Sequence, residues 1–372
     1  MVVEVSVVLP TMNEEKAVRK IIPQIKEALE RLNISYEILV VDKSTDKTPE
    51  IATEFGAKVI RQKRKGYGDA YLEGFKVAKG KYIVMLDPDG SYDPYEIPKL
   101  LEPLMNDKAD FVIGTRLKGE IKPGAMPWLH RYIGNPLLTK VLNIFFKVGV
   151  SDAHCGFRAI KKEALQKLPL KCRGMEFASE MVIEAAKAGL RIREVPITYH
   201  PRIGESKLSS FRDGWRHLRL MLLYSPSYLF LLPGVFLIVF GIVLLAYAYN
   251  TNPLRIHTMI LGSLLIIVGF QVINFGISGK VYAAKEGLDK PDKITKFFMR
   301  YSILEEGLVL GGILFMVGLL LGIRIFLKWR ATGYGELFEI KSAVIVLTLI
   351  ALSIQLIFFS FFVSSLMLKE EL

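Results

Sequence analysis

The pattern of apolar residues changes near residue 225. Before that point, short apolar runs alternate with segments that have apolar residues at helical spacing. After it come four long apolar stretches, at about 226–247, 259–278, 308–327 and 343–367. Each contains about the 20 apolar residues that a helix needs to cross a bilayer. We therefore expect a water-soluble domain over 1–208, a juxtamembrane helix over 209–225 and a four-helix transmembrane domain over 226–372.

Within the first 208 residues, β-branched runs alternate with helical periodicity. The pattern predicts strands at 3–9, 36–41, 58–61, 82–86 and 111–114, and helices at 14–32, 48–55, 70–79 and 94–105. Strand–helix alternation with short loops indicates an α/β fold with a mostly parallel sheet. Because ligands of such sheets bind at the carboxyl ends of the strands, the residues that follow each strand are the first candidates for a site.

Two further helical segments combine apolar and basic residues. In segment 211–224, Phe211, Trp215 and Leu218 share one face, whereas three arginines form a stripe on another (Arg212, Arg216 and Arg219). This is the pattern of an interfacial helix that lies at headgroup depth, although a helix buried by the same apolar residues is the alternative. Segment 126–148 is also too apolar for an ordinary surface helix, and we expect it to lie on the bilayer.

The net charge of +12 raises the question of a nucleic-acid partner. The basic residues are spread among acidic ones or lie beside the apolar stretches, so attraction to anionic lipid headgroups is the better interpretation. The connection at 280–300 is rich in lysine and that at 250–257 is not, which predicts that the first is cytoplasmic. We expect a multi-pass protein of the cell membrane, with the soluble domain on the cytoplasmic side and no nucleic-acid partner. The orientation of the last two spans and the oligomeric state stay open.

A carboxylate pair follows the fourth predicted strand, in Asp87-Pro88-Asp89-Gly90. Two carboxylates one residue apart at the end of a buried strand repel each other unless a cation shares them. Magnesium is usually bound by one or two carboxylates together with phosphate groups of the substrate. The pair therefore predicts a Mg²⁺ or Mn²⁺ site that serves a nucleoside diphosphate, with a surface turn as the alternative, because Asp, Pro and Gly all favour turns.

Three other segments at strand or helix ends are weaker candidates. Thr11 and Glu14 have the spacing of a capping box, which indicates the start of a helix. Asp42 follows the second strand, where a turn is an equally good interpretation. Gly66 and Gly68 precede the third helix, where glycines let backbone N–H groups approach a phosphate or a base, although two glycines alone are weak evidence.

Taken together, these motifs resemble those of a known enzyme family. Pro10-x-x-Asn13-Glu14, Asp42, Gly66-x-Gly68 and Asp87-x-Asp89 resemble the motifs of family 2 glycosyltransferases with the GT-A (Rossmann-like) fold. The downstream motifs Gly114-Thr115-Arg116, Arg131-x-x-x-Asn135, Asp152-x-x-Cys155-Gly156-Phe157-Arg158 and Arg202-x-Gly204-x-Ser206-Lys207-Leu208 look like those of the dolichol-phosphate mannose and glucose synthases. The resemblance covers residues 3–215, and the four-span tail is similar to that of some archaeal and bacterial members.

The resemblance implies a role for each matching residue. The nucleotide sugar would be bound by Pro10, Met12, Glu14, Asp42, Gly66, Asp87, Pro88, Asp89, Arg116, His200, Arg202 and Lys207. Asp87, Asp89 and Arg116 would be catalytic, and Asp87, Asp89 and Ser91 would hold the metal. The lipid phosphate would be bound by Arg131, Asn135, Arg158 and Ser206.

The implied reaction is the metal-dependent, inverting transfer of glucose or mannose from a nucleotide diphosphate sugar to a polyprenyl (dolichyl) phosphate. Departures from the mannose-synthase pattern at Met12, Lys43, Ser91, Glu176 and His200 leave open whether the donor is of the UDP-glucose or the GDP-mannose class. A phosphate acceptor is ionised near pH 7 and needs no general base, whereas a sugar hydroxyl does. Transfer to a hydroxyl acceptor, such as a lipid-linked saccharide, is the alternative reaction. A non-catalytic glycolipid flippase or scaffold is the alternative of another class, and the complete carboxylate pair argues against it.

Overall fold

The chain forms two compact units, Met1–Met221 and Leu222–Leu372. A computed structural model describes residues 3–204, 210–251, 255–286, 291–335 and 337–368. The boundary between the two units falls within segment 209–225, for which the sequence predicts a juxtamembrane helix. Each unit is described by itself below.

The first unit is built on a seven-stranded sheet. Its strands are β1 (Val5–Thr11), β2 (Tyr36–Asp42), β3 (Lys58–Arg61), β4 (Tyr82–Met85), β5 (Phe111–Ile121), β6 (Arg158–Lys161) and β7 (Ile192–Tyr199), in the order β3-β2-β1-β4-β6-β5-β7. Only β6 runs antiparallel to its neighbours β4 and β5. The prediction of an α/β unit with a mostly parallel sheet is confirmed.

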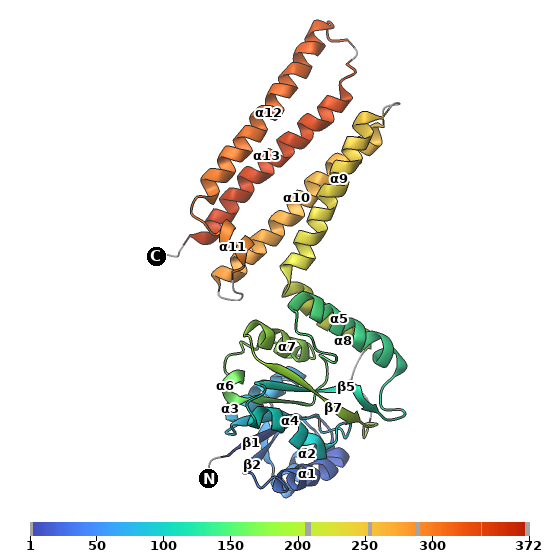
Figure 1. The fold of residues 1–372 in the computed structure, drawn as a ribbon, viewed down its shortest axis with the longest axis vertical. Helices are drawn as coiled ribbons and strands as arrows, with labels where there is room; N and C mark the ends of the chain where they lie inside the picture. Colours follow the sequence, from blue (N-terminus) through green and yellow to red (C-terminus); the bar gives the residue numbers. More distant parts are fainter. Residues whose placement is uncertain (1–2, 205–209, 252–254, 287–290, 336, 369–372) are drawn as a thin grey trace. The chain divides into compact units, whose positions relative to one another are not determined.

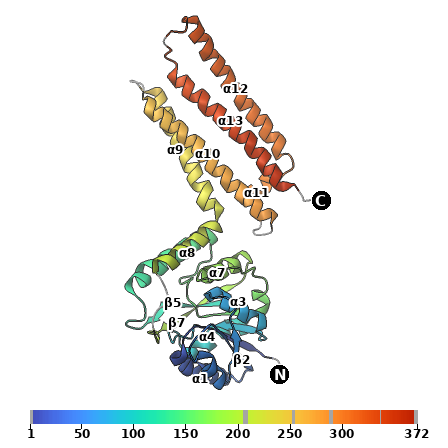
Figure 2. The same ribbon diagram turned by 180° about the vertical axis from the view of Figure 1, so that it is seen from behind.

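Helices cover the sheet on both sides, as Figures 1 and 2 show. The helices of this unit are α1 (Glu15–Glu30), α2 (Thr48–Glu54), α3 (Tyr67–Val77), α4 (Ile97–Met105), α5 (Asn135–Phe146), α6 (Lys162–Leu165), α7 (Phe177–Lys187) and α8 (Ser210–Leu223), with the short turns η1 (Pro94–Glu96) and η2 (His130–Gly134). Because both faces are covered, the central strands β1 and β4 are almost wholly apolar and buried.

Register places the first polar residues of neighbouring strands together. Thr11 at the end of β1 lies opposite Asp42 at the end of β2, and β4 lies on the other side of β1. Asp87 and Asp89 follow β4 directly, so the carboxyl ends of three adjacent parallel strands converge. This edge of the sheet carries the site described below.

The sequence pattern missed two strands. Strand β6 is only four residues long and carries buried Arg158 and Lys161 at its ends, so no apolar run marks it. Strand β7 at the edge of the sheet mixes charged and apolar residues and contains a proline, so it has no continuous apolar run, and β5 continues to Ile121, beyond the predicted end at residue 114. The apolar segment 126–148 forms a helix as predicted, in which the π turn η2 leads into α5.

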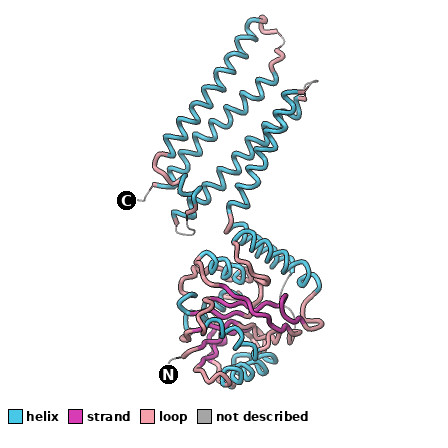
Figure 3. Tube along the Cα trace, viewed as in Figure 1, coloured by secondary structure: helices cyan, strands magenta, loops and turns pink. Residues whose placement is uncertain are grey.

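The described part of the second unit is helical apart from short loops, whereas all the named strands belong to the first unit (Figure 3). It contains η3 (Ser227–Leu231), α9 (Leu232–Asn250), α10 (Ile256–Lys285), α11 (Lys293–Phe298), α12 (Ile303–Ala331) and α13 (Ile340–Met367). Four helices are long and apolar enough to cross a membrane, namely Ser227–Asn250, Ile256–Lys285, Ile303–Ala331 and Ile340–Met367. They confirm the four predicted stretches and extend them at most ends.

Glycines bring α9 and α10 into close contact. A Cβ atom on Gly241 would lie 2.6 Å from the carbonyl oxygen of Gly262, and one on Gly262 would lie 2.8 Å from that of Gly241. Gly234 and Gly269 repeat this reciprocal contact further along the pair. Small residues that let two backbones approach are the usual means of packing helices in a bilayer, where burial of apolar surface gives no driving force.

Candidate functional site

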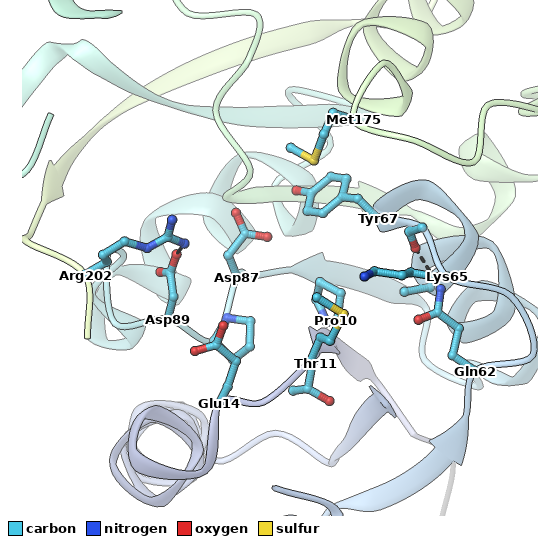
Figure 4. Close-up of a pocket in the computed structure, with 14 residues that line it drawn as sticks. Pro10, Thr11, Glu14, Gln62, Lys65, Tyr67, Asp87, Asp89, Met175 and Arg202 are labelled. Atoms are coloured by element: carbon cyan, nitrogen blue, oxygen red, sulfur yellow. Dashed lines mark hydrogen bonds and ion pairs between the residues drawn. The ribbon is translucent and has the colours of Figure 1, made fainter. Parts of the chain in front are cut away.

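A cavity of about 250 Å³ opens at the carboxyl ends of β1 and β4. Figure 4 shows carboxylates, an arginine and a tyrosine converging on it. Its walls are formed by Pro10, Thr11, Met12, Glu14, Gln62, Lys65, Gly66, Tyr67, Ala70, Asp87, Pro88, Asp89, Met175 and Arg202. Eight residues that the sequence assigned to the nucleotide sugar are therefore brought together here: Pro10, Met12, Glu14, Gly66, Asp87, Pro88, Asp89 and Arg202.

Asp87 is held in place by aromatic hydroxyls. The Tyr71 hydroxyl donates to Asp87 Oδ1 at 3.3 Å, and the Tyr67 hydroxyl also bonds to this carboxylate. On the other side lies Gly156, where a Cβ atom would come 2.4 Å from Asp87 Oδ2. Burial, and secondly the negative charge of Asp89, raise the pKa of Asp87 to about 6, whereas the two hydroxyls act in the opposite direction. The carboxylate is thus a buried negative charge that is only partly compensated.

Asp89 has a partner on each of its oxygens. The Ser91 N–H and hydroxyl both donate to Oδ1, the former at 2.9 Å, and the Arg202 guanidinium forms an ion pair with Oδ2 (Figure 4). The chain around Arg202 is fixed to the same loop, since the His200 N–H donates to the Ser91 carbonyl and the Ile203 N–H to the Asp89 carbonyl. Ser91 therefore lies beside Asp89, and its role as a metal ligand stays a prediction.

The donor set fits a hard divalent cation. Asp87, Asp89 and Ser91 offer only oxygen atoms, which Mg²⁺ and Mn²⁺ prefer. Two carboxylates in one buried loop, one of them already paired with an arginine, show that this position attracts positive charge. Among the described residues there is no group of three or more His, Cys, Asp or Glu side chains that could hold a metal ion. A cation bound here would take its remaining ligands from water and substrate phosphates, which is the usual mode for Mg²⁺.

The glycines before α3 serve packing as well as the cavity. A Cβ atom on Gly66 would lie 2.3 Å from the Arg173 carbonyl oxygen, and one on Gly68 would lie 2.3 Å from that of Cys172. The Asp69 N–H at the start of α3 donates to the Arg173 carbonyl at 3.1 Å. Because the Asp69 N–H already donates to the Arg173 carbonyl, it does not face a phosphate. The prediction that the glycines expose backbone N–H groups to a phosphate is therefore wrong for the N–H of Asp69.

The capping box between Thr11 and Glu14 is not formed. Thr11 ends β1, and its hydroxyl donates to Asp42 Oδ1 at 2.8 Å, while the N-cap of α1 is Glu14. Asp42 is fully buried, accepts two further hydrogen bonds from the N–H and hydroxyl of Ser44, and is not among the residues that line the cavity. In this structure its carboxylate ties β2 to β1 and to the following turn.

Two arginines from the predicted site are buried behind the cavity wall. Arg116 forms a bidentate ion pair with Asp152, at 2.7 Å and 2.8 Å, and does not line the cavity. Arg158 is 1% exposed and donates to the carbonyl oxygens of Ala153, Cys155 and Ala178. The prediction that Arg158 binds a lipid phosphate is therefore wrong for this arrangement, since its guanidinium is enclosed and satisfied by backbone.

The other predicted residues that the structure describes do not line the cavity. Arg131 lies on η2 with its guanidinium 5.3 Å from the centre of the Tyr132 ring, and Asn135 follows at the start of α5. His200 is half-buried and contacts Ser91 through its backbone. Ser206 and Lys207 lie outside the described residues.

The cavity also contains residues that the sequence did not assign to it: Thr11, Gln62, Lys65, Tyr67, Ala70 and Met175. Lys65 precedes Gly66 and Tyr67 lies between the two glycines, so their place in the cavity could have followed from a motif already noted. Met175 comes from the segment before α7, far along the chain, and no local pattern marks it.

A buried pair of histidines connects α8 to the rest of the first unit. The Ser179 hydroxyl on α7 lies 3.1 Å from His154 Nε2 and 2.8 Å from His217 Nδ1 on α8. Burial lowers the pKa of both imidazoles, that of His217 to about 4. His154 is used here in packing, with its ring 4.6 Å from that of His217.

Comparison with known proteins agrees with this architecture. The pattern of glycosyl transferase family 2 matches residues 6–169, and that of the glycosyltransferase family 2 C-terminal transmembrane region matches residues 277–367. The chain is 44% identical over 366 residues to the low-salt glycan biosynthesis hexosyltransferase Agl6 of Haloferax volcanii, covering 97% of this chain and 88% of that protein. It is 35% identical to the dolichyl-phosphate hexose transferase of the same organism, over 57% of this chain and 89% of the relative. It is 34% identical to the dolichol-phosphate mannosyltransferase of Pyrococcus furiosus, over 55% of this chain and 59% of the relative.

The chain belongs to glycosyltransferase family 2. It is a glycosyltransferase with a GT-A catalytic unit, and its four apolar helices and C-terminal region make it a multi-pass membrane protein. The family and fold class expected from the sequence are confirmed.

Proposed function

We propose that this enzyme transfers a hexose from a nucleotide diphosphate sugar to a polyprenyl phosphate, with inversion at the anomeric carbon. The observation that carries the proposal is the pair Asp87 and Asp89 beside Arg202 in one cavity at the carboxyl ends of parallel strands. Carboxylates for a cation and a guanidinium for phosphate oxygens form a site suited to a diphosphate leaving group. The names of the relatives, a dolichyl-phosphate hexose transferase and a dolichol-phosphate mannosyltransferase, support the choice of lipid acceptor.

In this proposal Asp87, Asp89 and Ser91 bind Mg²⁺ or Mn²⁺. A bound divalent cation neutralises the charge that develops on the departing diphosphate. Pro10, Met12, Glu14 and Gly66, which line the cavity, contact the nucleoside. Asp42 and Arg116 act from behind these residues, through their bonds to Thr11 and Asp152, and His200 and Lys207 are expected near the diphosphate. Arg202 binds diphosphate oxygens. Glucose and mannose, with UDP or GDP as carrier, are the donors to test.

The acceptor phosphate would be bound near η2 and α5. Trp128 and Tyr132 are 66% and 58% exposed there, next to Arg131, and Leu137 on α5 is 56% exposed. Helix α8 presents Trp215, which is 59% exposed, and arginines. Exposed aromatic and apolar side chains among basic residues are suited to the headgroup region of a bilayer. We propose that these two helices contact the cytoplasmic leaflet and that the acceptor reaches Arg131 and Asn135 from it.

The test is a donor and acceptor screen on the purified full-length protein. Radiolabelled UDP-glucose, GDP-mannose, UDP-mannose and GDP-glucose are each incubated with a polyprenyl phosphate or with the corresponding alcohol, in Mg²⁺ or Mn²⁺. We expect one donor to label the phosphate-containing lipid and none to label the alcohol. Proton NMR of the product reports the anomeric configuration. Transfer to the alcohol, or hydrolysis of every donor without lipid product, would refute the proposed acceptor.

A further inference from the structure

Arg202 holds the carboxylate that the proposed metal needs. Its guanidinium pairs with Asp89 Oδ2, while the Ser91 N–H and hydroxyl occupy Oδ1. A divalent cation approaching Asp89 therefore meets a carboxylate whose oxygens all have partners, one of them positively charged. Two like charges beside the same carboxylate repel each other, strongly so in a site shielded from water.

The negative charge of Asp87 explains why the ligand-free site keeps a positively charged side chain next to Asp89. Asp89 is 6% exposed and Asp87 is half-buried beside it, and two ionised carboxylates this close in a site largely removed from water are unfavourable without a counter-charge. Arg202 lines the same cavity, as Lys65 also does, and its ion pair with Asp89 provides a counter-charge at the carboxylate pair. The ion pair between Arg202 and Asp89 thus stabilises the site before any ligand binds. It does so at the position where we propose that the metal ion binds.

The side chain of Arg202 can change partner without movement of its backbone. Hydrogen bonds from the His200 N–H to Ser91, at 2.9 Å, and from the Ile203 N–H to Asp89, at 2.7 Å, fix the chain on both sides of it. The side chain itself is 31% exposed, so it is not enclosed by neighbours. A guanidinium binds phosphate oxygens at least as well as a carboxylate, since its planar donors match both.

We propose that Arg202 is a place-holder: it occupies Asp89 until the donor arrives and then transfers to the diphosphate, so that metal and nucleotide bind together. The inference rests on the proposed function. Before the donor is present, Arg202 competes with the divalent cation and keeps its affinity low. Once phosphate oxygens are available, Arg202 has another anionic partner and Asp89 is released. Because coupling between two ligands is reciprocal, the metal must in turn strengthen binding of the nucleotide.

The experiment measures Mn²⁺ affinity of the full-length protein in nanodiscs, by calorimetry and by the electron paramagnetic resonance signal of free Mn²⁺, without nucleotide. Arg202→Gln removes the charge at similar size, and Arg202→Lys is the matched control that keeps it. We expect Arg202→Gln to bind Mn²⁺ about two- to fivefold more tightly than the native protein, as removal of a partly exposed competing charge should allow. Arg202→Lys should stay close to the native affinity. A thermal melt of each variant checks that the fold is intact.

The same titrations with saturating UDP or GDP complete the test. The gain in Mn²⁺ affinity on adding the nucleotide should be smaller in Arg202→Gln than in the native protein, since the competing cation is already gone. If Arg202→Gln binds Mn²⁺ no more tightly than the native protein without nucleotide, or if Arg202→Lys behaves like Arg202→Gln, the place-holder role is refuted while the metal site stands. If no form binds Mn²⁺ even with UDP or GDP, the metal site itself is refuted.

Discussion

Asp89 is the residue on which the proposed chemistry depends most directly. We expect Asp89→Ala to lower the transfer rate by at least about 10²–10³, the usual cost of losing one electrostatic contact to a transition state. Chelation by EDTA should abolish transfer, and added Mg²⁺ or Mn²⁺ should restore it. Initial rates of radiolabelled lipid product measure both effects. Full activity in EDTA would refute the metal requirement.

Gly156 is required by the position of its neighbours rather than by its backbone angles. A Cβ atom there would lie 2.4 Å from Asp87 Oδ2 and 3.0 Å from the Tyr67 hydroxyl. Gly156→Ala should therefore displace Asp87 and reduce turnover at least about tenfold, because small displacements of reacting groups are costly. Gly214→Ala on α8 is the control, since nothing lies within 4 Å of the added atom. Steady-state kinetics and a thermal melt of both variants distinguish lost geometry from lost folding.

His217 makes stability depend on pH. Burial, with Arg158 adding to it and Asp213 opposing it, lowers its pKa to about 4 in the folded protein. In the unfolded chain a histidine titrates near pH 6.5, so between pH 6.5 and 4 the unfolded state binds the extra proton and the folded state does not. Stability is therefore complete above about pH 6.5 and falls as the pH decreases to 4, by up to about 1.4 kcal/mol per pH unit.

Melting temperatures measured from pH 7 to 4.5 check this expectation. His217→Gln should show a shallower decrease than the native protein, whatever its absolute stability, because one titrating group has been removed. His154, whose pKa burial also lowers, keeps part of the slope in the variant. Identical slopes in the two proteins would contradict the assignment.

At the scale of elements, the glycine contacts define how α9 meets α10. In Gly241→Leu the added Cβ would lie only 2.6 Å from the carbonyl oxygen of Gly262, and the rest of the leucine side chain would be crowded against the same helix. Overpacking typically costs about 1–3 kcal/mol, and a backbone atom cannot rotate away as a side chain can. We expect the melting temperature in detergent to fall by several degrees. Gly312→Leu on α12 has no atom within 4 Å of its Cβ and should leave the melting temperature near the native value.

The elements that sequence pattern predicts are those with a strong and continuous signal. The four apolar helices and strands β1, β2 and β4 follow from runs of apolar residues, which are typical of membrane spans and of a doubly covered sheet. Strand β6 was not predicted because the charged residues at its two ends, Arg158 and Lys161, are buried through long-range hydrogen bonds and ion pairs. Tertiary partners, not local sequence, decide such a segment.

The residues of the candidate site were also predictable only in part. Asp87, Asp89 and the first-strand residues were predictable because strand ends in parallel sheets converge. The roles of Arg116 and Arg158 were not, because a motif gives the residue type but not the direction of its side chain. Met175 reaches the cavity from a distant segment, and only the folded chain brings it there.

At the scale of the whole molecule, the two compact units predict separable tasks. A protein ending at Tyr224 keeps α8 and every described residue of the cavity. We expect it to retain its nucleotide affinity, measured by calorimetry, and to lose transfer at low lipid concentration, because tethering raises the effective concentration of a membrane acceptor. Excess acceptor in detergent should restore part of the rate. Loss of nucleotide binding on truncation would show that the spans belong to the catalytic fold.

The position of β6 in the sheet has a consequence for biosynthesis. Strand β6 pairs with β4, and the segment before β6 places Gly156 against Asp87. The catalytic unit is therefore incomplete until β6 has been synthesised. The contacts that complete it, from Arg202 and from His217 on α8, are translated before the first apolar helix at Ser227. Units of a chain tend to fold in order of synthesis. This order along the chain allows the catalytic unit to close before the insertion machinery receives its first transmembrane segment.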